Sequence, residues 1–135
     1  MIYKLSELQK IARENRFAIP HVLGGNLEMT YGAIKAAQEM ESPLALGFAP
    51  EVFASLPMAM VMPAIMNAAR EANIPIAVQL EHGKSYEQAA EAISLGAISV
   101  MYDGSDLTYE DNVRNTAEVV RMAHAFGACV EAELG

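Results

Sequence analysis

The strongest candidate for chemistry is the segment Gln79–Gly83, where Glu81 and His82 stand side by side at the end of an apolar run. A neutral imidazole is a common zinc ligand, and a carboxylate can act as a general acid or base. Gly83 allows the backbone to turn sharply directly after them. A purely structural interpretation stays open, with His82 facing solvent and Glu81 capping the next helix.

A second segment, residues 100–106, brings Asp103 to the end of another apolar run, directly before a Gly-Ser turn. Asp103 is therefore a candidate ligand for a metal ion or a water molecule. The alternative is an ordinary Asp-Gly-Ser turn, in which the aspartate binds its own backbone. Asp106 and Thr108 are better explained as caps at the entry of the following helix.

A third segment, residues 129–135, places Glu131 and Glu133 two positions apart, so both point to the same side of an extended strand. Carboxylates inside a barrel are costly unless they are hydrogen-bonded or bound to cations, which favours a ligand or metal contact. If this strand lies at a sheet edge, both groups can simply be solvated.

The other two histidines differ in their expected roles. His21 ends a short strand pattern shortly before a Gly-Gly pair, a rim position from which it can contact substrate. His124 lies near the C-terminal end of a helical pattern, where the helix dipole favours an imidazole, so we interpret it as structural.

The elements that must position these residues alternate along the chain. A leading helical pattern covers residues 4–15. Strand patterns then recur about every 22 to 32 residues, each followed by a helical pattern, which predicts an α/β fold with about five parallel strands. The strand patterns are 17–23, 44–48, 76–80, 98–102 and 129–134, and the helical patterns are 27–40, 58–71, 86–95 and 109–126. Either a doubly wound sheet or a barrel fits this period, and the polar residues at strand ends favour the barrel.

Length and composition narrow the class of protein. The chain has 135 residues, well below the roughly 250 of a complete eight-stranded barrel, so we expect residues 1–135 to form a single partial domain. With 17 acidic against 9 basic residues, the net charge of −8 argues against nucleic-acid and anionic membrane partners.

The N-terminal charges, the most apolar stretch and the cysteine count predict the cellular compartment. Charged residues at the N-terminus do not suit a secretory signal, and the most apolar stretch, 56–66, is interrupted by two prolines and is shorter than the roughly 20 residues of a membrane span. The single cysteine, Cys129, fits a reducing compartment, and we expect a cytoplasmic protein.

Three segments together resemble the signatures of the class II fructose- and tagatose-bisphosphate aldolases. The family reads approximately ALHLDHG, SVMIDGS and VEAELG, and this sequence reads VQLEHG at 78–83, SVMYDGS at 99–105 and VEAELG at 130–135, at nearly the same intervals. The resemblance also covers 108–127 well and 17–40 more loosely. It implies the N-terminal part of a TIM (β/α)8 barrel, in an enzyme whose zinc polarises the ketone carbonyl of a sugar bisphosphate.

The resemblance also implies roles for individual residues. His82 matches a zinc-binding histidine, and Asp103 and Glu133 match carboxylates of the metal region. Glu81 takes the place of the catalytic aspartate that protonates and deprotonates the C4 hydroxyl of the substrate. Glutamate is one methylene longer, which moves the carboxyl group by about 1 Å.

In the family, two further zinc-binding histidines and the phosphate-binding loops follow the VEAELG segment. The resemblance therefore implies aldolase activity for a complete protein and none for these 135 residues alone. We expect the inward residues of 76–80 and 98–102 to expose an apolar patch, so that the chain forms a homo-oligomer or pairs with a C-terminal half. The alternative function is a non-catalytic half-barrel that serves binding or assembly.

Overall fold

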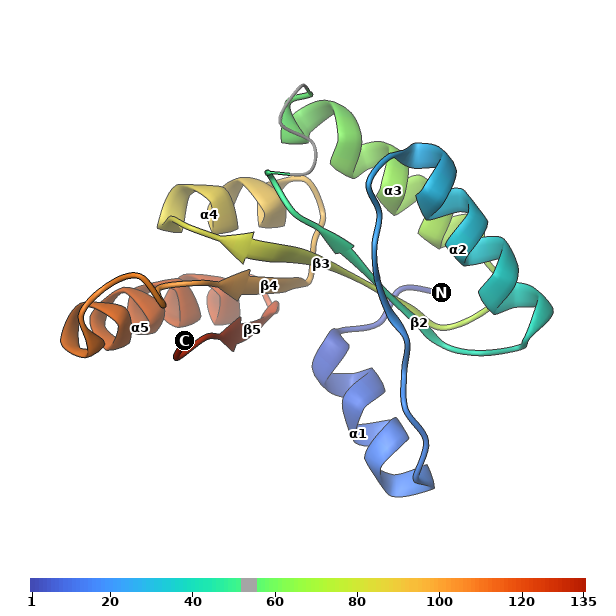
Figure 1. The fold of residues 1–135 in the computed structure, drawn as a ribbon, viewed down its shortest axis with the longest axis horizontal. Coiled ribbons are helices and arrows are strands. Elements are labelled where there is room, and N and C mark those ends of the chain that lie inside the picture. The colour runs from blue at the N-terminus through green and yellow to red at the C-terminus, as the bar shows by residue number, and fades with distance from the viewer. Residues whose placement is uncertain (52–55) are drawn as a thin grey trace.

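The computed structural model describes residues 1–51 and 56–135, which form a five-stranded parallel sheet with helices on both of its faces (Figure 1). The strands pair in chain order β1-β2-β3-β4-β5, which confirms the predicted parallel α/β sheet. Their bounds are β1 His21–Leu23, β2 Leu44–Phe48, β3 Ile76–Gly83, β4 Ser99–Tyr102 and β5 Cys129–Ala132.

One helix precedes the sheet and four helices connect its strands. They are α1 Leu5–Asn15, α2 Leu27–Glu39, α3 Met58–Glu71, α4 Tyr86–Ser94 and α5 Tyr109–Ala125. Capping fixes several ends: the side chain of Thr108 accepts a hydrogen bond from the Asp111 backbone N–H, and Gly127 follows α5 with a φ of +75°. Because each connecting helix returns the chain to the same side, every strand ends at one common edge of the sheet.

The outer face of the sheet carries the main core. Alternate residues of β2 and β3, among them Leu46 and Val78, pack against the connecting helices together with Met62 and Ile65 of α3. In this face the strand side chains are branched or long and nearly all buried, as expected for a parallel sheet covered by helices. This layer fixes where the strand ends lie.

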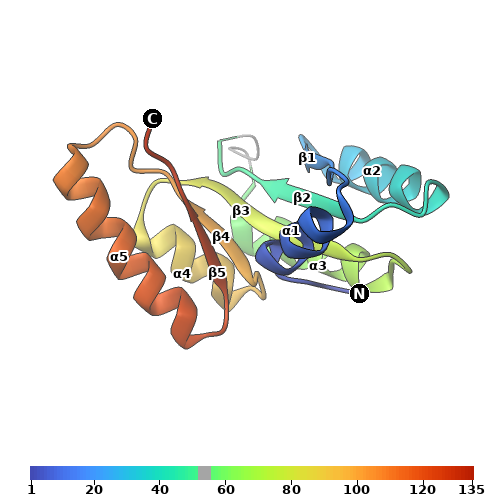
Figure 2. The ribbon, with the colours of Figure 1, turned by 90° about the horizontal axis from the view of Figure 1, so that it is seen from below.

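The side chains on the inner face of the sheet are mostly small or polar, and α1 covers part of this face. Leu5 and Leu8 of α1 pack on Ala45 and Ala77, so α1 lies on the opposite side of the sheet from α3 (Figures 1 and 2). The inward residue Gln79 is buried and donates a hydrogen bond to Glu131 at 2.7 Å. The expectation that 76–80 and 98–102 expose an apolar patch was therefore wrong. Ile76, Val78 and Leu80 point outward to the connecting helices, and the inward residues Ala77 and Met101 are also buried.

The bounds of four predicted strands also differ, and for β4 the difference is one residue, since it begins at Ser99 rather than at 98. Residues 17–20 precede β1 because the Phe17 N–H still bonds to α1, at the carbonyl of Ala12, and Pro20 has no N–H to donate. Strand β3 continues to Gly83 through a register irregularity against β4. Strand β5 ends at Ala132, so Glu133 lies just beyond it.

None of the helices in the described ranges combines the length and the apolar character that crossing a bilayer requires.

Candidate metal centre

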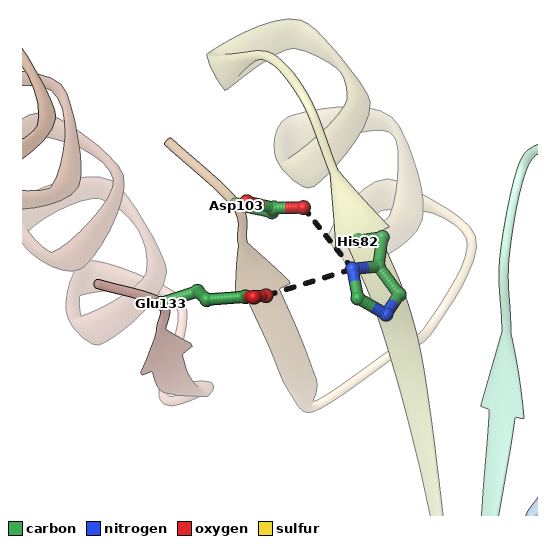
Figure 3. A group of neighbouring side chains, drawn as sticks. All are labelled: His82, Asp103 and Glu133. Atoms are coloured by element: carbon green, nitrogen blue, oxygen red, sulfur yellow. Dashed lines mark hydrogen bonds and ion pairs between the residues drawn. The ribbon is translucent and has the colours of Figure 1, made fainter. Parts of the chain in front are cut away.

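His82, Asp103 and Glu133 converge at the edge of the sheet where its strands end (Figure 3). They come from β3 and from the residues directly after β4 and β5, which are neighbouring strands, so the parallel order alone brings them together. Nδ1 of His82 lies 3.1 Å from Oδ2 of Asp103 and 3.6 Å from Oε2 of Glu133. One nitrogen and two carboxylate oxygens thus lie within 4.8 Å of one another.

His82 reaches this position through an unusual backbone. Its φ is +46°, in the left-handed region that non-glycine residues rarely adopt, and the pairing of β3 with β4 shifts register between Leu80 and Gly83. At Gly83 a Cβ would stand only 2.8 Å from the carbonyl oxygen of Met101, so the glycine permits the close approach of the two strands. The cost of this conformation is consistent with a functional position for the imidazole.

Asp103 is the most buried member of the group, and both of its carboxylate oxygens have partners. Oδ1 accepts hydrogen bonds from the backbone N–H and the hydroxyl of Ser105, at 3.1 and 2.6 Å. Oδ2 accepts one from Nζ of Lys84 at 2.6 Å and lies beside His82. The ammonium of Lys84 and the hydroxyl of Ser105 hold the pKa of Asp103 well below its usual range, so it is a carboxylate at neutral pH.

Lys84 is a residue of this site that the sequence interpretation did not single out. Its Nζ bridges Asp103 and, at 3.3 Å, Oδ2 of the exposed Asp106. The available signal was a lysine directly after Glu81–Gly83, where the strand delivers its polar residues. Of the two residues that the sequence predicts as helix caps, Thr108 caps α5, whereas Asp106 pairs with Lys84.

Glu133 is held by the last connecting helix. The side chain of the buried Asn112 in α5 donates a hydrogen bond to the Glu133 backbone carbonyl at 2.7 Å. The carboxylate of Glu133 and the ring of His82 are both partly exposed, at 35% and 47% of their side-chain surface. An ion can therefore reach the group from solvent. The hydrogen bond with Asp103 raises the pKa of His82, and the charges of Glu81 and Glu133 add to this effect.

Glu81 points to the inner face, away from the connecting helices α2–α5. Its Oε1 lies 3.1 Å from Nε2 of His21, yet this contact lacks hydrogen-bond alignment, and Oε1 is buried without a hydrogen-bond partner among the described residues. Burial raises the pKa of Glu81; the nearby carboxylates Glu131 and Glu133 add to the rise, whereas His21 opposes it. The structure thus joins His21, a weak candidate from sequence, to the candidate acid/base.

The other residues singled out from the sequence, Glu131 and His124, do not join the group formed by His82, Asp103 and Glu133. Glu131 binds Gln79, whereas Glu133 contacts His82, so the two glutamates have different partners. His124 occupies an exposed position in the last turn of α5, as expected for a structural role.

The donor set of the group fits a small divalent ion. With metal–ligand bonds of about 2.1 Å, tetrahedral ligands stand about 3.4 Å apart, and the two separations from His82 bracket this value. An imidazole with two carboxylates suits zinc and related ions better than it suits calcium, which prefers six or more oxygens.

Comparison with known proteins points to one family. The family model described as "Fructose-bisphosphate aldolase class-II" matches residues 3–135. The chain is 39% identical to the fructose-bisphosphate aldolase of Thermus caldophilus over 129 residues, covering 96% of this chain and 42% of that protein. It is 35% identical to the fructose-bisphosphate aldolase of Streptococcus pyogenes serotype M1 over 137 residues, covering 99% of this chain and 46% of that protein.

A solved structure agrees with these relatives. The crystal structure of the YdjI aldolase from Escherichia coli K12 superposes with a TM-score of 0.94 at 32% identity, covering 100% of this chain and 51% of that one. The five strands and their helices therefore match the N-terminal half of an aldolase TIM barrel. The chain spans about half the length of the curated relatives it matches.

Proposed function

Because the chain belongs to the class II fructose-bisphosphate aldolase family, we propose that it supplies the N-terminal half of a metal-dependent ketose-bisphosphate aldolase. The reaction is a reversible lyase reaction that gives dihydroxyacetone phosphate and an aldehyde. The observation that carries this proposal is the convergence of His82, Asp103 and Glu133 at the strand ends, where barrel active sites are built.

We assign the metal to His82, Asp103 and Glu133, with zinc as the ion. The separations of their donor atoms and the exposure of His82 and Glu133 support this assignment. When bound, the ion supplies a Lewis acid that polarises the substrate's ketone carbonyl. The chain's own contribution is a preformed set of donors: Ser105 fixes the rotamer of Asp103, and Asn112 fixes the backbone of Glu133.

We assign the acid/base role to Glu81. Cleavage breaks the bond between C3 and C4 of the ketose bisphosphate, and the proton of the C4 hydroxyl must pass to a base as the C4 carbonyl forms. The electron pair of the broken bond stays with C3, which takes up a proton to give dihydroxyacetone phosphate. The buried Oε1 of Glu81 has no hydrogen-bond partner among the described residues, so it can accept such a proton. The raised pKa of Glu81 suits a group that takes up a proton in one direction of the reaction and returns it in the other.

The partners that we propose follow from the length of this chain relative to its relatives. The relatives are about twice as long as these 135 residues, so we propose that these residues work with a C-terminal half-barrel or with a second copy of the same half. The small-molecule partner of the site is a sugar bisphosphate. We also propose a cytoplasmic location, because the lone Cys129 suits a reducing compartment.

A coupled cleavage assay tests this function. The protein is supplied with the C-terminal half of a family member and assayed with fructose 1,6-bisphosphate and tagatose 1,6-bisphosphate. We expect cleavage of at least one substrate and a loss of at least about a hundredfold in turnover for Glu81→Gln. Unchanged turnover in Glu81→Gln would reject the acid/base assignment, and bound zinc without cleavage of either substrate would favour the non-catalytic half-barrel.

A further inference from the structure

The ammonium group of Lys84 binds one of the oxygens that the proposed metal ion needs. Its Nζ lies 2.6 Å from Oδ2 of Asp103, the same oxygen that lies 3.1 Å from Nδ1 of His82. The other oxygen of Asp103 is bound by the backbone and the hydroxyl of Ser105. Asp103 can therefore offer only Oδ2 to an ion without breaking its contacts with Ser105. A cation already binds that oxygen.

A second carboxylate lies within reach of the same lysine. Oδ2 of Asp106 is 3.3 Å from Nζ of Lys84, and the Asp106 side chain is 88% exposed, so it is free to approach. Lys84 itself is about half exposed and has a flexible four-carbon stem. A small movement of Nζ from Asp103 towards Asp106 keeps the lysine paired while it frees Oδ2.

We propose that Lys84 is a built-in competitor for the divalent ion, which neutralises Asp103 in the metal-free site and shifts onto Asp106 when the ion binds. This inference rests on the metal centre proposed above. Two cations on one carboxylate oxygen repel each other, so the ion must displace the ammonium group. Lys84 thus keeps the buried Asp103 paired without metal and lowers the affinity of the site for the ion.

Zinc titration of the metal-free chain by isothermal calorimetry tests this role. Lys84→Met removes the competitor and should lower the zinc Kd at least about tenfold, whereas Lys84→Arg keeps the charge and should change it less. Asp106→Asn removes the alternative partner of Lys84 and should raise the Kd a few-fold. Lys35→Met, on the remote helix α2, is the matched control for loss of a lysine and should change nothing.

A double-mutant cycle separates the proposed shift from simple charge effects. If Asp106 acts through Lys84, Asp106→Asn should lose most of its effect in the Lys84→Met background. An equal effect in both backgrounds would overturn the shift onto Asp106. Lys84→Gln provides a second neutral variant. The zinc-induced rise in Tm gives a second readout of binding, and this rise should be larger in both neutral variants than in the wild type.

The outcomes distinguish the two proposals. If the wild type binds zinc and His82→Ala does not, but the neutral Lys84 variants bind zinc equally or more weakly, Lys84 is no competitor and the metal centre stands. If the wild type binds zinc no better than His82→Ala, the metal centre fails, and the role of Lys84 is rejected with it.

Discussion

Nε2 of His21 lies 3.1 Å from Oε1 of Glu81, although the two residues belong to β1 and β3, with β2 between them. The contact is possible because Gly47 of β2 leaves room. A Cβ at position 47 would stand 2.7 Å from Cγ of Glu81 and 3.0 Å from Nε2 of His21. The missing side chain in the middle strand thus lets an imidazole from the edge strand approach the candidate acid/base.

Gly47→Ala should destabilise the protein by about 1 to 3 kcal/mol, because the new methyl group overpacks the inner face and displaces Glu81. Urea unfolding measures the change. The matched control is Gly32→Ala in α2, where a Cβ meets nothing within 4 Å and should stabilise the helix by about 0.5 to 1 kcal/mol. Equal effects of the two substitutions would contradict the crowding at Gly47.

Leu8→Ala should cost about 2 to 5 kcal/mol of the free energy of unfolding, because Leu8 is 1% exposed in the cluster that joins α1 to Ala45 and Ala77. Ile11→Ala, on the same helix at 41% exposure, should cost much less. Chemical denaturation of both variants provides the comparison. If Leu8→Ala costs no more than Ile11→Ala, α1 does not pack on the inner face as described.

The thiol of Cys129 should ionise at a lower pH than a free cysteine. Burial by itself raises its pKa, but hydrogen bonds with Ser99 and Ser6 outweigh burial and lower it from the ordinary 9.0. The rate of alkylation by iodoacetamide should therefore rise with pH and reach half its maximum at a lower pH than for the thiol of the same protein unfolded in urea. Ser99→Ala should move this midpoint upward, and a midpoint that stays in place would reject the contribution of Ser99.

Local pattern predicted most of the fold. The bounds predicted for β2 and α3 agree with the structure because Pro43 and Pro57 mark where each element can begin. All of β2 is buried, and α3 buries one apolar face while Met60 on its other face is 66% exposed. The same pattern failed at 17–20, where apolar residues continue into a connecting segment. Apolar character alone does not show whether backbone N–H groups have a strand to pair with.

The candidate site was only partly predictable. The order of parallel strands was enough to bring His82, Asp103 and Glu133 to one edge. The positions of Lys84 and His21 relative to these groups depend on side-chain rotamers and on the small residue Gly47 in the intervening strand. Such contacts join residues far apart in sequence, and no periodic pattern encodes them.

Glu81→Gln should keep its bound zinc, because Glu81 points to the inner face and is not one of the three proposed ligands. Elemental analysis of the purified variant measures this directly. Its zinc content should equal that of the wild type within about 20%, while turnover in the reconstituted assay falls. Loss of zinc from Glu81→Gln would place Glu81 among the ligands and remove it from the acid/base role.

The zinc affinity of the metal-free chain, compared between the wild type and His82→Ala, tests whether His82 and its two carboxylate neighbours form a metal site. His82→Ala removes the only nitrogen donor of the group and should weaken zinc binding at least about a hundredfold. His124→Ala, which removes an exposed histidine from α5, is the matched control and should bind zinc as the wild type does. We expect one tight zinc site that His82→Ala abolishes and His124→Ala preserves, and equal zinc affinity in all three proteins would rule out the proposed metal centre.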